Sequence, residues 1–258
     1  MTASIQTADI GRASGSAPFK PFHRWDRNFF AAYVVLIWVG IAMGFGTDIV
    51  LHIQTKAAPY PLIVHVHAAA FMGWLVLFTA QVGLIRAGNQ ALHRKFGYAA
   101  IGLALAMLVI GPATAIVVDS LVFARKGTPP IFVSVQFADM LAFAGLTGAG
   151  VLLRNDASAH KRLMLLGVLY ISDAGFSRGL GDGVTAVLGD NPVGFYFNLY
   201  LGNTALILGL GVYDLITRRR LHPVYAPALA YILAIQLSAV WLFYAPYWKP
   251  IALYLIGH

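Results

Sequence analysis

The chain contains no cysteine, and only 11% of its 258 residues are charged. Without thiols there can be no disulfide, no thiolate metal site and no covalently attached haem c. Any metal or haem would have to be held by histidine, carboxylate or methionine side chains. The low charge contrasts with the roughly 25% of charged residues in soluble domains. Together with a mean hydropathy of +0.73, it predicts a protein that crosses a membrane several times.

Apolar runs of about 20 residues, the length needed to cross a bilayer as a helix, recur along the chain. They cover residues 29–50, 61–85, 97–122, 130–153, 163–187, 193–217 and 224–247. The runs are continuous and do not alternate between polar and apolar residues as the strands of a membrane barrel do. The sequence therefore predicts an all-α, polytopic membrane helical bundle of about seven transmembrane helices.

The basic residues predict the orientation of the bundle. Lys20, Arg24 and Arg27 precede the first apolar run, and the positive-inside rule then places the N-terminus in the cytoplasm. Residues 1–24 are expected to form a disordered cytoplasmic tail and residues 25–258 a single transmembrane domain. The predicted location is a bacterial inner membrane, with the lipid bilayer as partner. Because the net charge of +8 lies beside the apolar runs, we expect no binding to nucleic acid.

After the first helix the chain follows a repeat of about 65 residues, which predicts one helix plus three hairpins. Each unit opens with a proline, turns at arginine, and begins its outward helix just after a histidine; these histidines are His93, His160 and His222. Whether the repeat is a true duplication or shared topogenic punctuation stays open.

The repeat also aligns polar residues at one depth in the outer half of the bundle. These residues are His65, His67, Ser134, Gln136, Tyr196 and Asn198. Ionisable or polar residues on the same or neighbouring levels are Asp119, Asp139, Asp173, Arg178, Asp182 and Asn203. Because such groups face the interior of a bundle or a water-filled cavity, we expect a polar pocket that opens to the outside and accepts a small molecule.

His65 and His67 are two residues apart and point in different directions on a helix. His67, Trp74 and Gln81 follow at steps of seven and share one face. We therefore expect His67 in the interior and His65 toward a neighbouring helix or the headgroups.

A neutral imidazole in this position is a suitable ligand for haem iron, copper or zinc when a partner orients its second nitrogen. The candidate partners are Asp139, Gln136, Asn198, Asp182 and His52. The alternative is a hydrogen bond between helices, which is common in membrane bundles.

Arg178 and Asp182 are four residues apart and lie on one helix face. We expect an ion pair between them; the alternatives are an anion site or a proton route with Asp173. The surrounding GFSRGLGDG is rich in glycine, which permits close helix packing or a broken helix.

His93 and His160 lie in basic clusters at corresponding positions of adjacent hairpins. The clusters are typical of topogenic loops. Alternatively, the two histidines meet across the bundle and bind a haem or metal at the inner face. The last apolar run contains no lysine, which excludes a retinal Schiff base.

The loops carry a family resemblance. His93, Arg94 and Gly97, then His160, Lys161 and Met164, and later Arg178 resemble the motifs of a group of bacterial multi-pass membrane proteins without an established activity. The resemblance covers roughly residues 81–180 and implies the same topology. The histidines also give a looser likeness to membrane cytochromes b, which is an analogy of architecture only.

The leading functional prediction is a membrane redox protein that binds haem b or a transition metal. His67, with His65 tentatively beside it, would be the outer metal ligand, Gln136 and Asp139 would orient it, and Trp74 would pack beside it. Arg178 and Asp182 would balance an anion such as a propionate. Two alternatives are a proton-coupled transporter or binding protein without metal, and an accessory subunit of a membrane complex.

Overall fold

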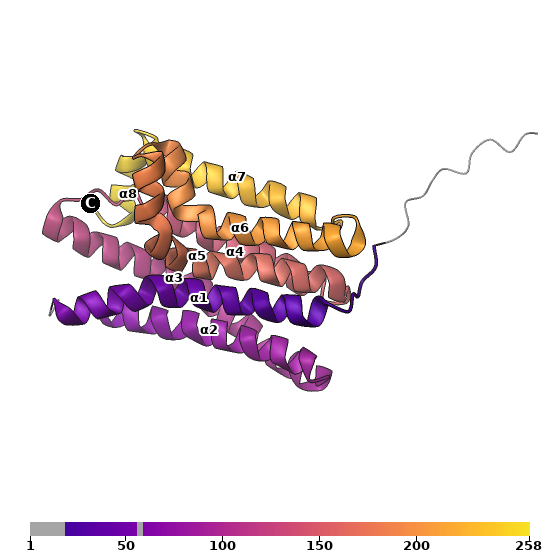
Figure 1. The fold of residues 1–258 in the computed structure, drawn as a ribbon. Helices are drawn as coiled ribbons and strands as arrows, with labels where there is room; N and C mark the ends of the chain where they lie inside the picture. Colours follow the sequence, from indigo (N-terminus) through magenta and orange to yellow (C-terminus); the bar gives the residue numbers. More distant parts are fainter. Residues whose placement is uncertain (1–18, 56–58) are drawn as a thin grey trace, which may run out of the picture.

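The computed structural model describes residues 19–55 and 59–258, and these residues form an all-helical bundle (Figure 1). The helices are α1 (Asp26–Gln54), α2 (Leu62–Arg86), α3 (Gln90–Lys126), α4 (Val133–Leu152), α5 (Ala157–Leu188), α6 (Pro192–Arg218), α7 (Tyr225–Tyr244) and α8 (Trp248–Leu255). Within the described ranges, seven helices, α1 to α7, are long and apolar enough to cross a membrane. The predicted helix class and the seven spans are confirmed; α8, which is too short to span, was not predicted.

The polar first turns of α3 and α5 extend beyond the predicted apolar runs. Asn89 and Asp156 cap these helices, with side-chain oxygens that accept hydrogen bonds from backbone N–H groups of the first turn. Both helices therefore begin before His93 and His160, not after them as predicted. Among the three histidines of the repeat, His222 alone precedes its helix, α7.

The helices run up and down, so that successive connections alternate between two ends of the bundle (Figure 1). The start of α1 and the connections at residues 87–89, 153–156 and 219–224 lie together, and we call this the basic end. The other end, which we call the opposite end, contains the connections at residues 127–132 and 189–191 together with α8. The grouping of the basic loops follows the topology expected from the sequence.

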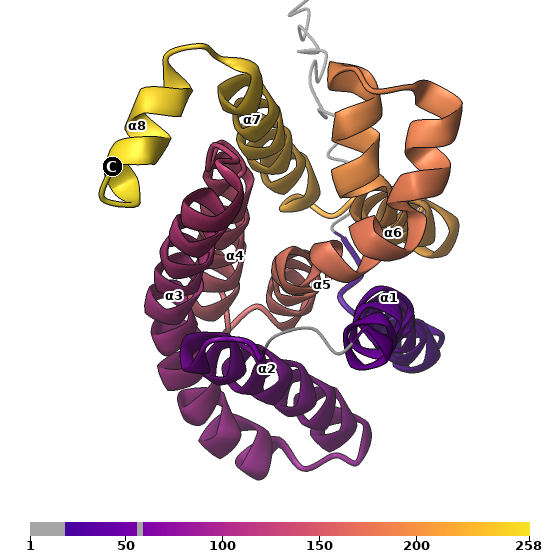
Figure 2. The ribbon, with the colours of Figure 1, turned by 90° about the vertical axis from the view of Figure 1, so that its left-hand side faces the viewer.

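Helix α5 lies at the centre of the bundle, where it packs against α1, α4 and α6 (Figure 2). Helix α7 packs on α4, and α2 and α3 form a hairpin attached through α4. In both ribbon views the α5–α6 hairpin bends away from the bundle axis near the opposite end. The outward faces of the helices expose many large apolar side chains, such as Val35, Leu105, Leu208 and Trp241, as expected for contact with a lipid bilayer.

Glycines allow α5 and α1 to approach closely. A Cβ atom on Gly44 of α1 would lie 2.1 Å from the carbonyl oxygen of Gly175 on α5, and a Cβ on Gly175 would lie 2.6 Å from the carbonyl oxygen of Gly40. Gly40 and Gly44 form a GxxxG pair, the pattern with which membrane helices bring their backbones together. Close packing, the first of the two predicted roles of the glycine-rich GFSRGLGDG, is therefore observed.

Candidate functional site

The interior of the bundle contains a group of polar side chains contributed by α4, α5, α6 and α7, which we call the interior polar cluster. Its members are Asp139, Tyr170, Asp173, Tyr196, Tyr200 and Gln236. The Gln236 side chain joins two of the tyrosines, because its Nε2 donates to the Tyr170 hydroxyl at 3.0 Å and its Oε1 accepts from the Tyr196 hydroxyl at 2.8 Å. Four helices thus converge on one polar centre.

The two carboxyl groups of the cluster interact directly. The Asp139 side chain from α4 meets the Asp173 side chain from α5, and the Tyr200 hydroxyl from α6 lies next to Asp139. Asp173 is only 6% exposed, and its Oδ1 accepts a hydrogen bond from the backbone N–H of Ala174 at 2.7 Å. Both aspartates were expected inside the bundle from the sequence, but their pairing was not predicted.

Several buried polar atoms of Asp139 and of α6 have no hydrogen-bond partner among the described residues. They are Oδ1 of Asp139, the hydroxyl of Tyr200 and both amide atoms of Asn203, one turn further along α6. Tyr200 and Asn203 are fully buried. Because buried polar groups in proteins are nearly always hydrogen-bonded, these atoms are available to a proton, a water molecule or a ligand within the bundle.

The predicted face of α2 is confirmed. His67 is half-buried and stacks on Phe71 with ring centroids 3.9 Å apart. Trp74 is 2% exposed and Gln81 is half-buried, whereas His65 is exposed. The buried Nδ1 of His67 and Nε1 of Trp74 have no hydrogen-bond partner among the described residues.

None of the partners proposed for His67 forms a hydrogen bond to its buried Nδ1. Asp139 meets Asp173, Asn198 bonds to Ser177 and Thr185, and Asp182 is exposed. His52 stacks on Tyr60. Oε1 of Gln136 is buried and has no hydrogen-bond partner in the described ranges. The same holds for Oδ2 of Asp119, which was not proposed as a partner of His67.

The polar layer predicted from the repeat does not converge into one pocket. Ser134 donates to the carbonyl oxygen of Ile131 in its own chain segment, Tyr196 turns to Gln236, and Asn198 binds residues of α5. The sequence aligned these residues by depth, whereas rotation about each helix axis and the bend of the α5–α6 hairpin direct them to different neighbours.

The predicted ion pair between Arg178 and Asp182 is not formed. Nε of Arg178 instead donates to Oδ2 of Asp48 on α1 at 2.7 Å, and its guanidinium lies over the ring of Phe45. Both partners are about half exposed. The close packing of α1 on α5 makes Asp48 the nearer carboxylate, so the interaction connects two helices rather than two turns of one helix.

Metal ligands are not concentrated in the part of the chain that the structure describes. No group of three or more histidine and acidic side chains there could hold a metal ion. Two histidines do meet, however: the rings of His93 and His160 lie 6.2 Å apart, centroid to centroid, at the basic end. This is the arrangement that the alternative interpretation of the two loop motifs anticipated.

The basic end also contains a network of ion pairs that sequence analysis missed. Arg162 and Asp214 are fully buried, with Nε of the arginine 2.8 Å from Oδ2 of the aspartate. Asp26 binds Lys161 at 2.7 Å and Arg218 at 2.8 Å. The sequence indicated only a topogenic role for the three basic residues and no role for the two aspartates, because partners up to 192 positions apart cannot be identified from local patterns.

His222 lies against this network and is 6% exposed. Its Nδ1 accepts a hydrogen bond from the backbone N–H of Val224 at 3.2 Å, and its ring meets the edge of Phe19. Burial, together with the positive charge of Arg162, lowers the pKa of His222 to about 4. The imidazole is therefore neutral at physiological pH.

Phe19 also covers Arg162 and Arg218. This part of the predicted disordered tail therefore packs on the bundle; residues 1–18 lie outside the described residues.

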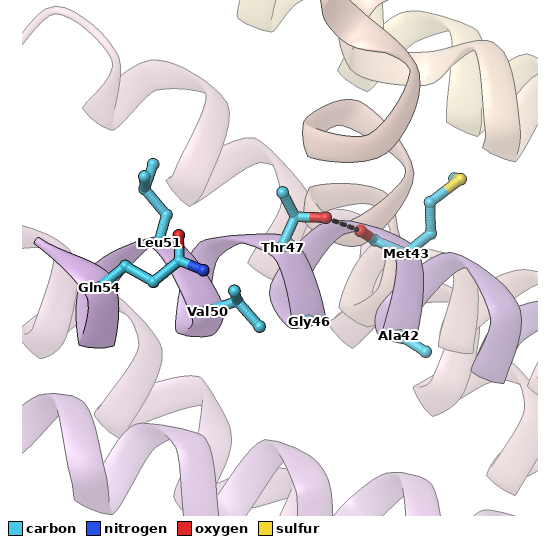
Figure 3. Close-up of a pocket in the computed structure, with 7 residues that line it drawn as sticks. All are labelled: Ala42, Met43, Gly46, Thr47, Val50, Leu51 and Gln54. Atoms are coloured by element: carbon cyan, nitrogen blue, oxygen red, sulfur yellow. Dashed lines mark hydrogen bonds between the residues drawn. The ribbon is translucent and has the colours of Figure 1, made fainter.

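The groove in Figure 3 is formed by α1 alone. It is lined by Ala42, Met43, Gly46, Thr47, Val50, Leu51 and Gln54. Its one hydrogen bond among the side chains drawn joins the Thr47 hydroxyl to the carbonyl oxygen of Met43. None of the predicted site residues lines it, so it is a surface groove of one helix rather than the expected polar pocket.

The fold and the interior cluster define an integral membrane protein built as a seven-helix bundle with a polar centre. Comparisons with protein-family models, with curated proteins and with solved structures give no match.

Proposed function

We propose that this chain is a proton-coupled membrane transporter or binding protein in which Asp139 and Asp173 together form the proton-binding site. The observation that supports the proposal is the direct contact of two carboxyl side chains from different helices inside the bundle. Two adjacent carboxylates in a medium of low dielectric constant cannot both be charged without compensation. The pair therefore needs a shared proton or a bound cation.

The surroundings of the pair suit the transfer of a proton. The Tyr200 hydroxyl lies beside Asp139, and Tyr170 is near enough to both carboxyls to interact with them electrostatically. Gln236 continues the polar contacts from Tyr170 to Tyr196. The cluster spans four helices, so a change in protonation would alter the contacts between α4, α5 and α6. A change in helix packing that follows from the protonation of one site is the general requirement of a coupled carrier.

The contacts of the described residues support a haem-binding redox protein centred on His67 less well than they support a proton site at the carboxyl pair. None of its predicted partners hydrogen-bonds to the imidazole, and Asp139, which was expected to orient it, contacts Asp173 instead. An imidazole without an orienting partner is a poor metal ligand.

The first test is infrared difference spectroscopy of the purified protein between acidic and alkaline buffer. A carboxylic acid that loses its proton gives a negative C=O stretching band. We expect such a band in the wild type and its loss or shift in both Asp139→Asn and Asp173→Asn, because each substitution removes one of the two coupled groups.

The matched control is Asp119→Asn, which replaces a carboxyl on α3 that lies outside the cluster. This variant should keep the wild-type band. A band that is unchanged in both cluster variants, or that disappears only in Asp119→Asn, would rule out the carboxyl pair as the proton site.

The small molecule can then be sought by a thermal-stability screen of metabolites at two pH values. A ligand coupled to the proton should raise the melting temperature of the wild type by an amount that depends on pH. In the double variant Asp139→Asn/Asp173→Asn, which leaves no carboxyl in the pair, the pH dependence of that increase should disappear. If a ligand is found whose effect has the same pH dependence in the variant, coupling through the pair is refuted.

A further inference from the structure

We propose that His93 and His160 bind one copper(I) ion at the basic end of the bundle, with the thioether of Met164 as a third ligand. The proposal is independent of the carboxyl pair, because no residue is shared between the two sites. It rests on the separation of the two imidazoles, on the orientation of His160, on the place of Met164 and on the local charge.

The two histidines are held at equivalent positions near the starts of α3 and α5. The backbone N–H of His93 donates to the carbonyl oxygen of the capping Asn89, and that of His160 donates to the carbonyl oxygen of the capping Asp156. Each histidine is thus the fourth residue after its helix cap. Nε2 of Gln81 on α2 donates to the carbonyl oxygen of His93 at 3.1 Å, which connects α2 to the start of α3.

The separation of the rings fits two nitrogen ligands on opposite sides of one metal. With a metal–nitrogen bond of about 2 Å and about 1.1 Å from that nitrogen to the ring centre, opposed imidazoles have centroids about 6 Å apart, against about 5 Å in a tetrahedral site. The observed distance between the His93 and His160 centroids is 6.2 Å. Near-linear coordination by two nitrogens is characteristic of copper(I), whereas zinc prefers the tetrahedral arrangement.

His160 is oriented as a metal ligand requires. Its Nδ1 lies 2.7 Å from the carbonyl oxygen of Gly150, and because a carbonyl can only accept, Nδ1 carries the proton. Nε2 is therefore left with its lone pair free. A backbone carbonyl that fixes the tautomer in this way is the usual second contact of a metal-binding histidine. Nδ1 of His93 is buried without a hydrogen-bond partner in the described ranges.

A soft ligand lies next to the pair. Met164 is one helical turn beyond His160 on α5, and a Cβ atom on Gly150 would lie 3.0 Å from the Met164 sulfur. The thioether therefore sits beside the glycine whose carbonyl orients His160. In a chain without cysteine, methionine is the remaining sulfur ligand, and thioethers favour copper(I) over harder ions.

The surrounding charge also favours a monovalent ion. Arg94 lies close enough to His93 to act on it electrostatically, whereas the charge of Lys161, the residue after His160, is paired with Asp26. Positive neighbours oppose a divalent cation roughly twice as strongly as a monovalent one at the same distance. Among metal ions that bind both imidazole and thioether ligands, copper(I) is therefore the one that the positive charge near this site repels least.

The test is a copper(I) competition titration of the full-length protein in detergent, with a chromophoric copper(I) chelator as competitor. We expect one equivalent of copper(I) per chain and its loss in His93→Gln and in His160→Asn. The asparagine amide can still donate to the carbonyl oxygen of Gly150, so the fold around residue 160 should be kept; the melting temperature of each variant checks this. Met164→Leu should weaken binding on the order of tenfold.

The matched control is His65→Gln, which replaces an exposed histidine at the opposite end of α2 and should retain copper. X-ray absorption of the loaded wild type should show two nitrogen neighbours and one sulfur neighbour. The proposal is overturned if no copper(I) binds, if both histidine variants keep it, or if zinc competes at equal concentration. Haemin that binds through the same two histidines in preference to copper would also overturn it, and would assign the pair to haem iron.

Discussion

At the scale of single residues, the basic end illustrates how charged side chains become buried within a membrane bundle. Arg162 and Asp214 have no exposed surface and are joined through two guanidinium nitrogens, and Nη1 of Arg162 also donates to the carbonyl oxygen and the hydroxyl of Ser158. These contacts satisfy the hydrogen-bonding groups of the guanidinium and of the carboxylate and compensate their charges. A buried pair of this kind is sensitive to the loss of either partner, because the remaining charge stays buried.

The pair gives a prediction at the residue scale. Arg162→Met should destabilise the protein by about 3 kcal/mol, since it leaves the Asp214 carboxylate with Arg218 at 3.7 Å as its remaining ion-pair partner. The double variant Arg162→Met/Asp214→Leu should recover most of the loss, because no uncompensated charge remains. Thermal or denaturant unfolding in detergent measures both. A double variant no more stable than the single one would contradict this account.

At the scale of elements, the contact of α1 with α5 depends on small residues rather than on large apolar ones. Gly44 and Gly175 let the two backbones touch, and the Phe176 ring fills the space above Gly40 and Gly202. Van der Waals packing of this kind is the main source of association between helices in a bilayer, where apolar side chains gain little by leaving lipid. The glycines are thus part of the interface rather than points of flexibility.

The prediction for this interface compares two glycines of α1. Gly44→Ala should cost about 1 to 3 kcal/mol, because the new methyl group would overlap the carbonyl oxygen of Gly175 and separate the helices. Gly46→Ala places its methyl group where no atom lies within 4 Å and should be neutral or slightly stabilising. The melting temperatures of the two variants in the same detergent measure this difference. Equal decreases in melting temperature would show that the contact between Gly44 and Gly175 does not limit stability.

At the scale of the whole molecule, the distribution of charge between the two ends predicts the orientation. The basic end gathers the arginine-rich and lysine-rich connections, and the positive-inside rule places it in the cytoplasm. The absence of cysteine makes this testable without background labelling. In intact cells, a membrane-impermeant maleimide should label Thr128→Cys at the opposite end but not Asn155→Cys at the basic end, although both positions are exposed. Labelling of Asn155→Cys alone would reverse the topology.

The helical class, the number of spans and the interior face of α2 could be read from the sequence. A bilayer imposes a length of about 20 apolar residues on every crossing, and this constraint acts locally along the chain. Spacing by seven likewise places His67, Trp74 and Gln81 on one helix face wherever the helix lies. These properties depend on distance along the chain, which the sequence states directly.

The partners of the polar residues were decided by the tertiary structure alone. Arg178 was expected to pair with Asp182 but meets Asp48, and Asp139 meets Asp173 instead of His67. Such choices depend on the rotation of each helix about its axis and on the close glycine contact between α1 and α5. These are properties of pairs of helices, so the periodicity of a single segment does not predict them. The free energy that determines them is gained only when the helices pack.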